Sequence, residues 1–104
     1  GKVHLSLDAQ KATVRNNYGW QNLRLSGDVG ALFVDLDGSA ALEAPALQVQ
    51  DSISFRSESP LSSWLRADQI LLKAQLYGAG NLYYSKTPVT LLKTEYGTGK
   101  VLPK

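Results

Sequence analysis

The stretch from Tyr77 to Leu82, Tyr-Gly-Ala-Gly-Asn-Leu, decides the fold because versions of it recur along the chain. Residues 18–23 read Tyr-Gly-Trp-Gln-Asn-Leu and share four of six positions with it. Residues 96–101, Tyr-Gly-Thr-Gly-Lys-Val, keep its Tyr-Gly-x-Gly frame, and residues 37–42 and 56–61 fill the gaps between the copies. This recurrence indicates that the chain is built from repeated structural units.

The spacing of the copies identifies the architecture. The apolar residues that end the copies follow one another at steps of 19, 19, 21 and 19, and they are Leu23, Leu42, Leu61, Leu82 and Val101. A unit of about 19 residues with three short strands and three corners corresponds to one coil of a parallel β-helix. Short alternating apolar runs such as Leu72-Ala74-Leu76 are typical of strands with one buried face. The sequence therefore predicts an all-β, short parallel β-helix of about five coils of 19–21 residues, with an antiparallel β-sandwich as the alternative.

The length of 104 residues supports a single domain over residues 1–104, because two independent cores rarely form in halves of this size. The repeat places approximate coils at residues 18–36, 37–55, 56–76, 77–95 and 96–104, with residues 2–17 as an irregular first coil or cap. The two extra residues of the third of these coils coincide with a short candidate helical turn at 59–66. Glycine recurs at the corners, and we expect it there because a repeated corner needs a backbone dihedral that a Cβ disfavours.

Two columns of apolar residues are expected to point inward from these coils. The first consists of the five residues that end the repeat copies, and the second of Leu36, Phe55 and Leu76. Equivalent residues of successive coils lie one strand spacing apart, so each column forms a ladder. These apolar ladders predict that side chains fill the interior of the coils and exclude water.

Composition excludes several classes of function. The chain has no cysteine and a single histidine, His4, which we interpret as a surface or strand residue, so thiolate chemistry and a histidine zinc cluster are excluded. Eleven basic and nine acidic residues give a net charge of +2, too balanced for a nucleic-acid-binding surface. No apolar run approaches the roughly 18–20 residues of a membrane span. The Gly-x-Gly corners lack the other elements of a phosphate loop, so we expect no cofactor and no metal.

Paired carboxylates are the remaining candidates for catalysis. Asp35 and Asp37 share one face of an apolar run, whereas glycoside hydrolysis requires two carboxylates across a cleft about 5–9.5 Å wide. A coil this small has little room for such a cleft. We therefore interpret both as exposed side chains that flank buried residues, and we expect no enzyme.

The column that precedes the corner glycine is the most informative set of polar residues. By the repeat alignment it reads Tyr18, Asp37, Arg56, Tyr77 and Tyr96. Neighbours in this column lie one coil apart, which predicts three contacts: Asp37 with Arg56, Arg56 over the Tyr77 ring, and Tyr77 stacked on Tyr96. The column, together with Trp20, Tyr83 and Tyr84, is either a ladder that fixes the register of the coils or a face that binds glycan.

The two ends of a β-helix expose strand edges, which invite pairing unless they are guarded. Pro103, with Lys100 and Lys104, blunts the C-terminal edge. The run from Lys2 to Leu7 has no proline or glycine guard. We expect this N-terminal edge to pack on a second chain, an upstream segment or a local cap from residues 8–17.

Three segments resemble the closing coils of bacterial head GIN domains, a family of auto-transporter adhesin heads of unknown function. They are residues 76–84 and 96–101, which carry the Gly-x-Gly corners, and residues 86–89, which read Lys-Thr-Pro-Val. The resemblance implies a right-handed β-helix that is exported to the periplasm or the cell surface. It brings no established catalytic or binding residues. We therefore expect a non-catalytic extracytoplasmic module with a structural or adhesive role, and a carbohydrate-binding module with an exposed Tyr/Trp face as the alternative.

Overall fold

A computed structural model of the chain describes residues 2–16, 20–37 and 39–103. These residues form strands that all pair in parallel within one sheet. The strands are β1 (Lys2–Asn16), β2 (Trp20–Leu36), β3 (Ser39–Ser57), β4 (Ser63–Arg66), β5 (Leu71–Leu76), β6 (Leu82–Ser85), β7 (Thr90–Glu95) and β8 (Val101–Pro103). They wind into about five coils of a β-solenoid, which confirms the predicted parallel β-helix.

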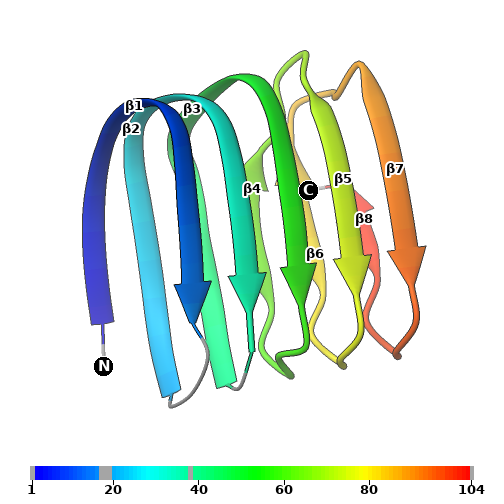
Figure 1. The fold of residues 1–104 in the computed structure, drawn as a ribbon. Helices are drawn as coiled ribbons and strands as arrows, with labels where there is room; N and C mark the ends of the chain where they lie inside the picture. The colour runs from blue at the N-terminus through cyan, green and yellow to red at the C-terminus, as the bar shows by residue number, and fades with distance from the viewer. Residues whose placement is uncertain (1, 17–19, 38, 104) are drawn as a thin grey trace.

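Each coil has two walls that are joined over a curved top (Figure 1). The rear wall runs in the order β1-β2-β3-β4-β6-β8, and β5 and β7 continue the front wall that begins with the second halves of β1, β2 and β3. The chain rises through the rear wall and descends through the front wall as the coils advance, which is a right-handed winding (Figure 1).

The prediction of three short strands per coil is wrong. β1, β2 and β3 are single long strands that pass over the top without interruption. In the later coils the strand breaks at the top, where Gln69 and Lys86 adopt left-handed φ values of 57° and 69°. A left-handed residue ends a β ladder, so these coils divide into β4 and β5 and into β6 and β7.

Two local expectations for the chain are also corrected. Residues 2–16 form no irregular coil or cap, because β1 pairs with β2 in constant register, from Lys2 opposite Asn22 to Asn16 opposite Leu36. β1 contains neither glycine nor proline, which are the residues that most often interrupt a strand ladder. The candidate helical turn at 59–66 is absent as well, since Ser63–Arg66 forms strand β4 with an alternating burial pattern.

The interior is an apolar stack, with columns that differ in one coil from those predicted. The first column is Leu23, Leu42, Ser63, Leu82 and Val101, so Ser63 replaces the expected Leu61. The second is Leu36, Ser57 and Leu76, and Phe55 instead lies opposite Val34 and Ala74.

Two irregularities in β3 cause both differences. The register between β2 and β3 shifts between Arg24 and Ser26 and again between Val29 and Ala31. Each shift adds one residue to β3, so the extra residues lie before Ser57 and not in the following corner. Pro45, which has no N–H to donate to the ladder, lies within the first irregularity.

Candidate functional site

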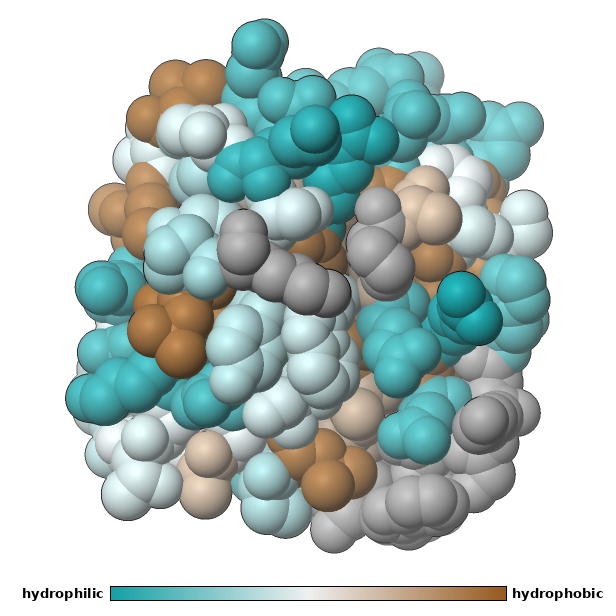
Figure 2. Space-filling view, turned by 180° about the vertical axis from the view of Figure 1, so that it is seen from behind, coloured by the Kyte–Doolittle hydropathy of each residue, from teal (hydrophilic) through white to brown (hydrophobic). Residues whose placement is uncertain are grey.

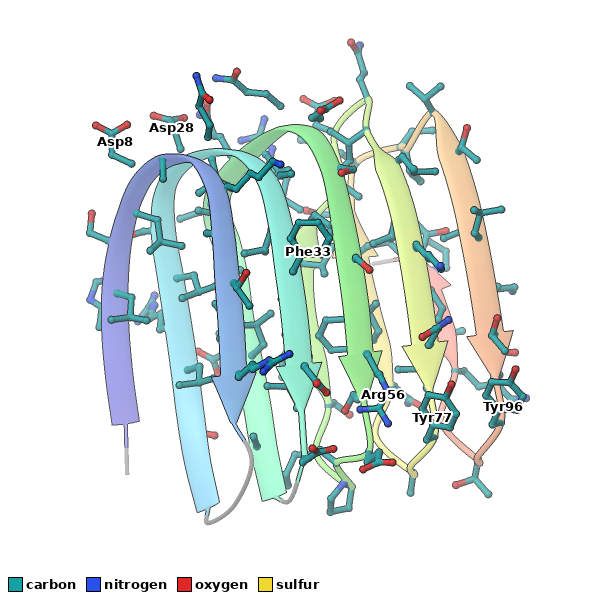
Figure 3. The ribbon with its side chains drawn as sticks, in the orientation of Figure 1. Asp8, Asp28, Phe33, Arg56, Tyr77 and Tyr96 are labelled. Atoms are coloured by element: carbon teal, nitrogen blue, oxygen red, sulfur yellow. The ribbon has the colours of Figure 1, made fainter. Side chains whose placement is uncertain are left out.

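The lower front corner of the solenoid carries Arg56, Tyr77 and Tyr96 in a row, one from each of three successive coils (Figure 3). The Arg56 guanidinium carbon lies 5.0 Å from the centroid of the Tyr77 ring. The Tyr77 and Tyr96 rings are stacked, with centroids 4.8 Å apart and an interplanar angle of 13°. This separation is the strand spacing of a β-sheet, so the coil repeat itself stacks the rings. We call these three residues and the carboxylates around Arg56 the corner ladder.

Three carboxylates surround the Arg56 guanidinium. Nη1 of Arg56 donates a hydrogen bond to Oδ1 of Asp35 at 2.8 Å and lies 3.6 Å from Oδ1 of Asp37, while Nη2 lies 3.2 Å from Oε1 of Glu58. The hydrogen bond to Asp35 raises the pKa of Arg56 above its ordinary value. A hydrogen bond with Asp37, and then the Asp37 charge, raise the pKa of Glu58. The charged groups of this corner therefore interact with one another.

The three contacts predicted from the repeat column, from Asp37 through to Tyr96, are present in the structure. The backbone register is different, however, because Arg56 lies opposite Asp35 and Gln75 and reaches the next column with its long side chain. Sequence reasoning missed the Asp35 contact, because the extra residues of β3 place these two residues 21 apart. Tyr18, which begins the predicted column, lies outside the described residues.

A second aromatic pair lies on the rear wall, the face shown in Figure 2. The Trp64 ring on β4 stacks on the Tyr83 ring on β6, with centroids 5.5 Å apart and an interplanar angle of 17°. Nδ2 of Asn81 donates a hydrogen bond to the Tyr83 hydroxyl at 3.1 Å. Sequence reasoning did not pair Trp64 with Tyr83, although their separation of 19 residues equals the repeat and could have revealed the pair.

The remaining candidate residues do not extend either pair into a continuous aromatic face. Tyr84 follows Tyr83 on β6, so it points to the other side of the strand and packs against the core. Trp20 lies in β2 opposite Ser39, and its side chain is outside the described part of the structure. The structure thus brings Arg56, Tyr77 and Tyr96 together and holds Tyr83 on a different wall.

The top of the molecule has a hollow with a volume of ≈ 280 Å³. Asp8 and Asp28 lie above the first two coils at this end (Figure 3). The hollow is lined by Asp8, Ala9, Gln10, Asp28, Val29, Gly30 and Gln50. It contains no nucleophile beside a general base, and within residues 2–16, 20–37 and 39–103 no group of three histidine, cysteine or carboxylate side chains could hold a metal ion.

The fold and the paired outer side chains define a short parallel β-solenoid whose coils are linked by ladders on their outer faces. The family model described as "Putative auto-transporter adhesin, head GIN domain" matches residues 1–88, and the chain belongs to this family. Neither a curated protein nor a solved structure matches the chain. Membership implies a location outside the cytoplasm and is consistent with a non-catalytic surface module. No helix in the described part of the chain is long and apolar enough to cross a membrane.

Proposed function

We propose that this chain is a non-catalytic module of the periplasm or cell surface, with a structural or adhesive role. The observation that carries the proposal is the corner ladder, where the three carboxylates pair with Arg56. Asp35, Asp37 and Glu58 all surround Arg56, so they do not stand across a cleft as the two carboxylates of a glycosidase do. The interior is filled by apolar side chains and offers no room for a substrate.

Bead adhesion tests this proposal directly. Beads that carry the folded chain are expected to attach to bacterial or host-cell surfaces under flow more strongly than beads that carry the same chain after heat denaturation. A panel of glycoside and ester substrates is expected to show no turnover above the buffer rate. Turnover that disappears in Arg56→Ala would contradict the non-catalytic assignment, and equal attachment of folded and denatured chains would leave only the structural role.

A carbohydrate-binding role is the second candidate, and the stacking of the corner ladder indicates which ring would bind the sugar. Arg56 from the preceding coil covers one face of Tyr77, and Tyr96 from the following coil covers the other. Tyr77 therefore has no open face for a sugar ring. Tyr96 is the last ring of the ladder and is 67% exposed, so its outer face is the surface on which a pyranose ring could stack.

Glycan-array screening followed by titration separates the two roles. If the chain binds a glycan through the ladder, Tyr96→Ala should weaken binding by about tenfold or more, since the open aromatic face is lost. Tyr83→Ala removes a ring that is stacked on the rear wall and serves as the matched control. Binding that survives Tyr96→Ala, or no binding at all, would remove the carbohydrate role.

A further inference from the structure

The two ends of the solenoid are built differently. In the last coil, Lys93 and Glu95 occupy the inward positions that the preceding coil fills with Ala74 and Leu76. Oε2 of Glu95 accepts a hydrogen bond from the backbone N–H of Val101 at 2.9 Å. Charged side chains at inward positions of an edge strand prevent another strand from adding there. Lys93 and Glu95 therefore disfavour the addition of another strand beside β7.

The first described strand, β1, carries no charged residue at the corresponding inward positions. The inward positions of β1 hold Leu5, Leu7, Ala12 and Val14, which continue the columns of Leu25, Gly27, Leu32 and Val34. Leu5 is 39% exposed, whereas Leu25 behind it is 1% exposed. The fifteen residues of β1 pair only with β2, so within the described part of the chain their second backbone edge has no neighbouring strand. The apolar interior and this edge meet at β1.

From these observations we infer that the β1 edge binds a second copy of this chain about a two-fold axis. β1 is an arch, with a rear arm, an apex and a front arm (Figure 1), and Asp8 lies close to the apex (Figure 3). A two-fold axis through the apex places the rear arm of one copy against the front arm of the other. The two β1 strands then pair antiparallel along the whole arch, and the end of each copy covers the apolar interior of the other copy.

The alternation of β1 permits this pairing. Inward residues of the rear arm, such as Leu5 and Leu7, have odd numbers, and those of the front arm, Ala12 and Val14, have even numbers. In an antiparallel pair the numbers of opposite residues have a constant sum. Every register with an odd sum therefore sets inward residues opposite inward residues and outward residues opposite outward residues.

The outward charges favour the same arrangement. Asp8 lies on the rear arm, and Lys11 and Arg15 lie on the front arm, all three exposed. In the registers centred on the apex, Asp8 of one copy faces Lys11 or Arg15 of the other, directly or on the diagonal. A head-to-tail stack would instead set the apolar β1 end against Lys93 and Glu95.

Analytical ultracentrifugation over a range of protein concentrations tests the inference. The chain is expected to show a monomer–dimer equilibrium without larger species. Leu5→Lys places a charge at the inward edge, as Lys93 does at the other end, and should lower the association constant by about tenfold or more while circular dichroism stays unchanged. A chain that is monomeric at all concentrations, or that forms open-ended oligomers, would overturn the inference.

Charge reversal provides a second measurement that does not depend on the core. Asp8→Lys should weaken the dimer, and the double variant with Asp8→Lys and Lys11→Asp should restore it, because the opposite charges meet again across the two-fold axis. Asp28→Lys is the matched control, since Asp28 lies directly behind Asp8 on β2 and away from the edge. A dimer that weakens equally in Asp8→Lys and Asp28→Lys, or that is not restored in the double variant, would contradict the proposed pairing.

Discussion

Close approach of the backbone explains the glycines at the lower corners of the last coils. A Cβ on Gly80 would collide with the carbonyl oxygen of Leu61, and a Cβ on Gly99 with that of Gly80. Among the glycines in the described residues, only Gly27 has a positive φ, of 107°. Gly19 and Gly38 lie outside the described residues, and the expectation that a repeated corner glycine serves an unusual dihedral is wrong for Gly78 and Gly97, which have close backbone contacts as well. They are needed because a side chain would push successive coils apart.

Gly80→Ala is expected to destabilise the fold by about 1–3 kcal/mol, because the methyl group meets rigid backbone that must shift. Thermal unfolding followed by circular dichroism measures the change. Ala79→Ser, at the exposed neighbouring position, is the control and should leave the midpoint nearly unchanged. Equal midpoints for the two variants would show that the corner can relax around a Cβ.

Glu58 gives the corner ladder a dependence on pH. Because the pKa of Glu58 is raised in the folded state, the folded chain binds its proton more tightly than the unfolded chain does. The ionised carboxylate thus opposes folding at neutral pH, and this opposition disappears as the pH falls from above the raised pKa to below the ordinary value of 4.5. Glu58→Gln should be at least as stable as the parent chain at neutral pH.

Urea denaturation at neutral pH and at a pH below 4.5 measures both parts of this prediction. The stability difference between Glu58→Gln and the parent chain should vanish at the lower pH. A glutamine variant that is clearly less stable at neutral pH would mean that the contact with Arg56 outweighs the repulsion from Asp37.

At the scale of the strands, the junction between β3 and β4 depends on buried serine hydroxyls. Oγ of Ser59 accepts hydrogen bonds from the backbone N–H groups of Ala40 and Leu61, both at 3.0 Å. Oγ of Ser63 accepts one from the N–H of Leu42, also at 3.0 Å. Ser59 lies in the corner between the end of β3 and the start of β4, and Ser63 is the first residue of β4. Their hydroxyls accept hydrogen bonds from the first residues of β3, in the coil before. They complete the ladder between the third and fourth coils.

Ser59→Ala should leave the buried N–H of Ala40 without its acceptor, at a cost of about 1–3 kcal/mol, and the partly buried N–H of Leu61 without its acceptor at a smaller cost. Chemical denaturation provides the measurement. Ser54→Ala, on the outer face of β3, is the matched control and should change stability little. A loss no larger than that of the control would indicate that another group replaces the Ser59 hydroxyl.

Strand pairing also shows how far sequence could predict this molecule. The steps of 19 residues predicted the parallel solenoid, since only stacked coils keep so constant a period. They also predicted the stack of Tyr77 on Tyr96, which are 19 residues apart. The positions of Ser63 and Phe55 could not be predicted, because an alignment of repeats cannot tell an extra residue in a corner from one in a strand. Pro45 was the one local signal that the extra residues lie within β3.

For the whole molecule, stability should vary along the solenoid axis. β3 is hydrogen-bonded on both sides, whereas β1, β7 and β8 each pair with one neighbour within the described residues. Stacked repeats gain much of their stability from the interfaces between neighbouring coils. The middle of the chain should therefore open last.

Amide hydrogen exchange at low protein concentration is expected to show the strongest protection in β3 and decreasing protection toward β1 and β8. At concentrations where the chain is dimeric, the β1 amides should become protected while those of β8 should not. Uniform protection at low concentration would show that the coils open as a single unit.

The charged inward pair Lys93 and Glu95 has a consequence for how such a gene can lengthen. Between β6 and β8, equivalent residues are separated by 19 positions, so an in-frame duplication of one repeat adds a whole coil without disturbing the columns on either side. Duplications upstream of Lys93 extend the apolar interior. A duplication that includes Lys93 and Glu95 would bury two charges between coils, which is costly. Growth of this architecture by duplication is therefore directed toward its amino-terminal side.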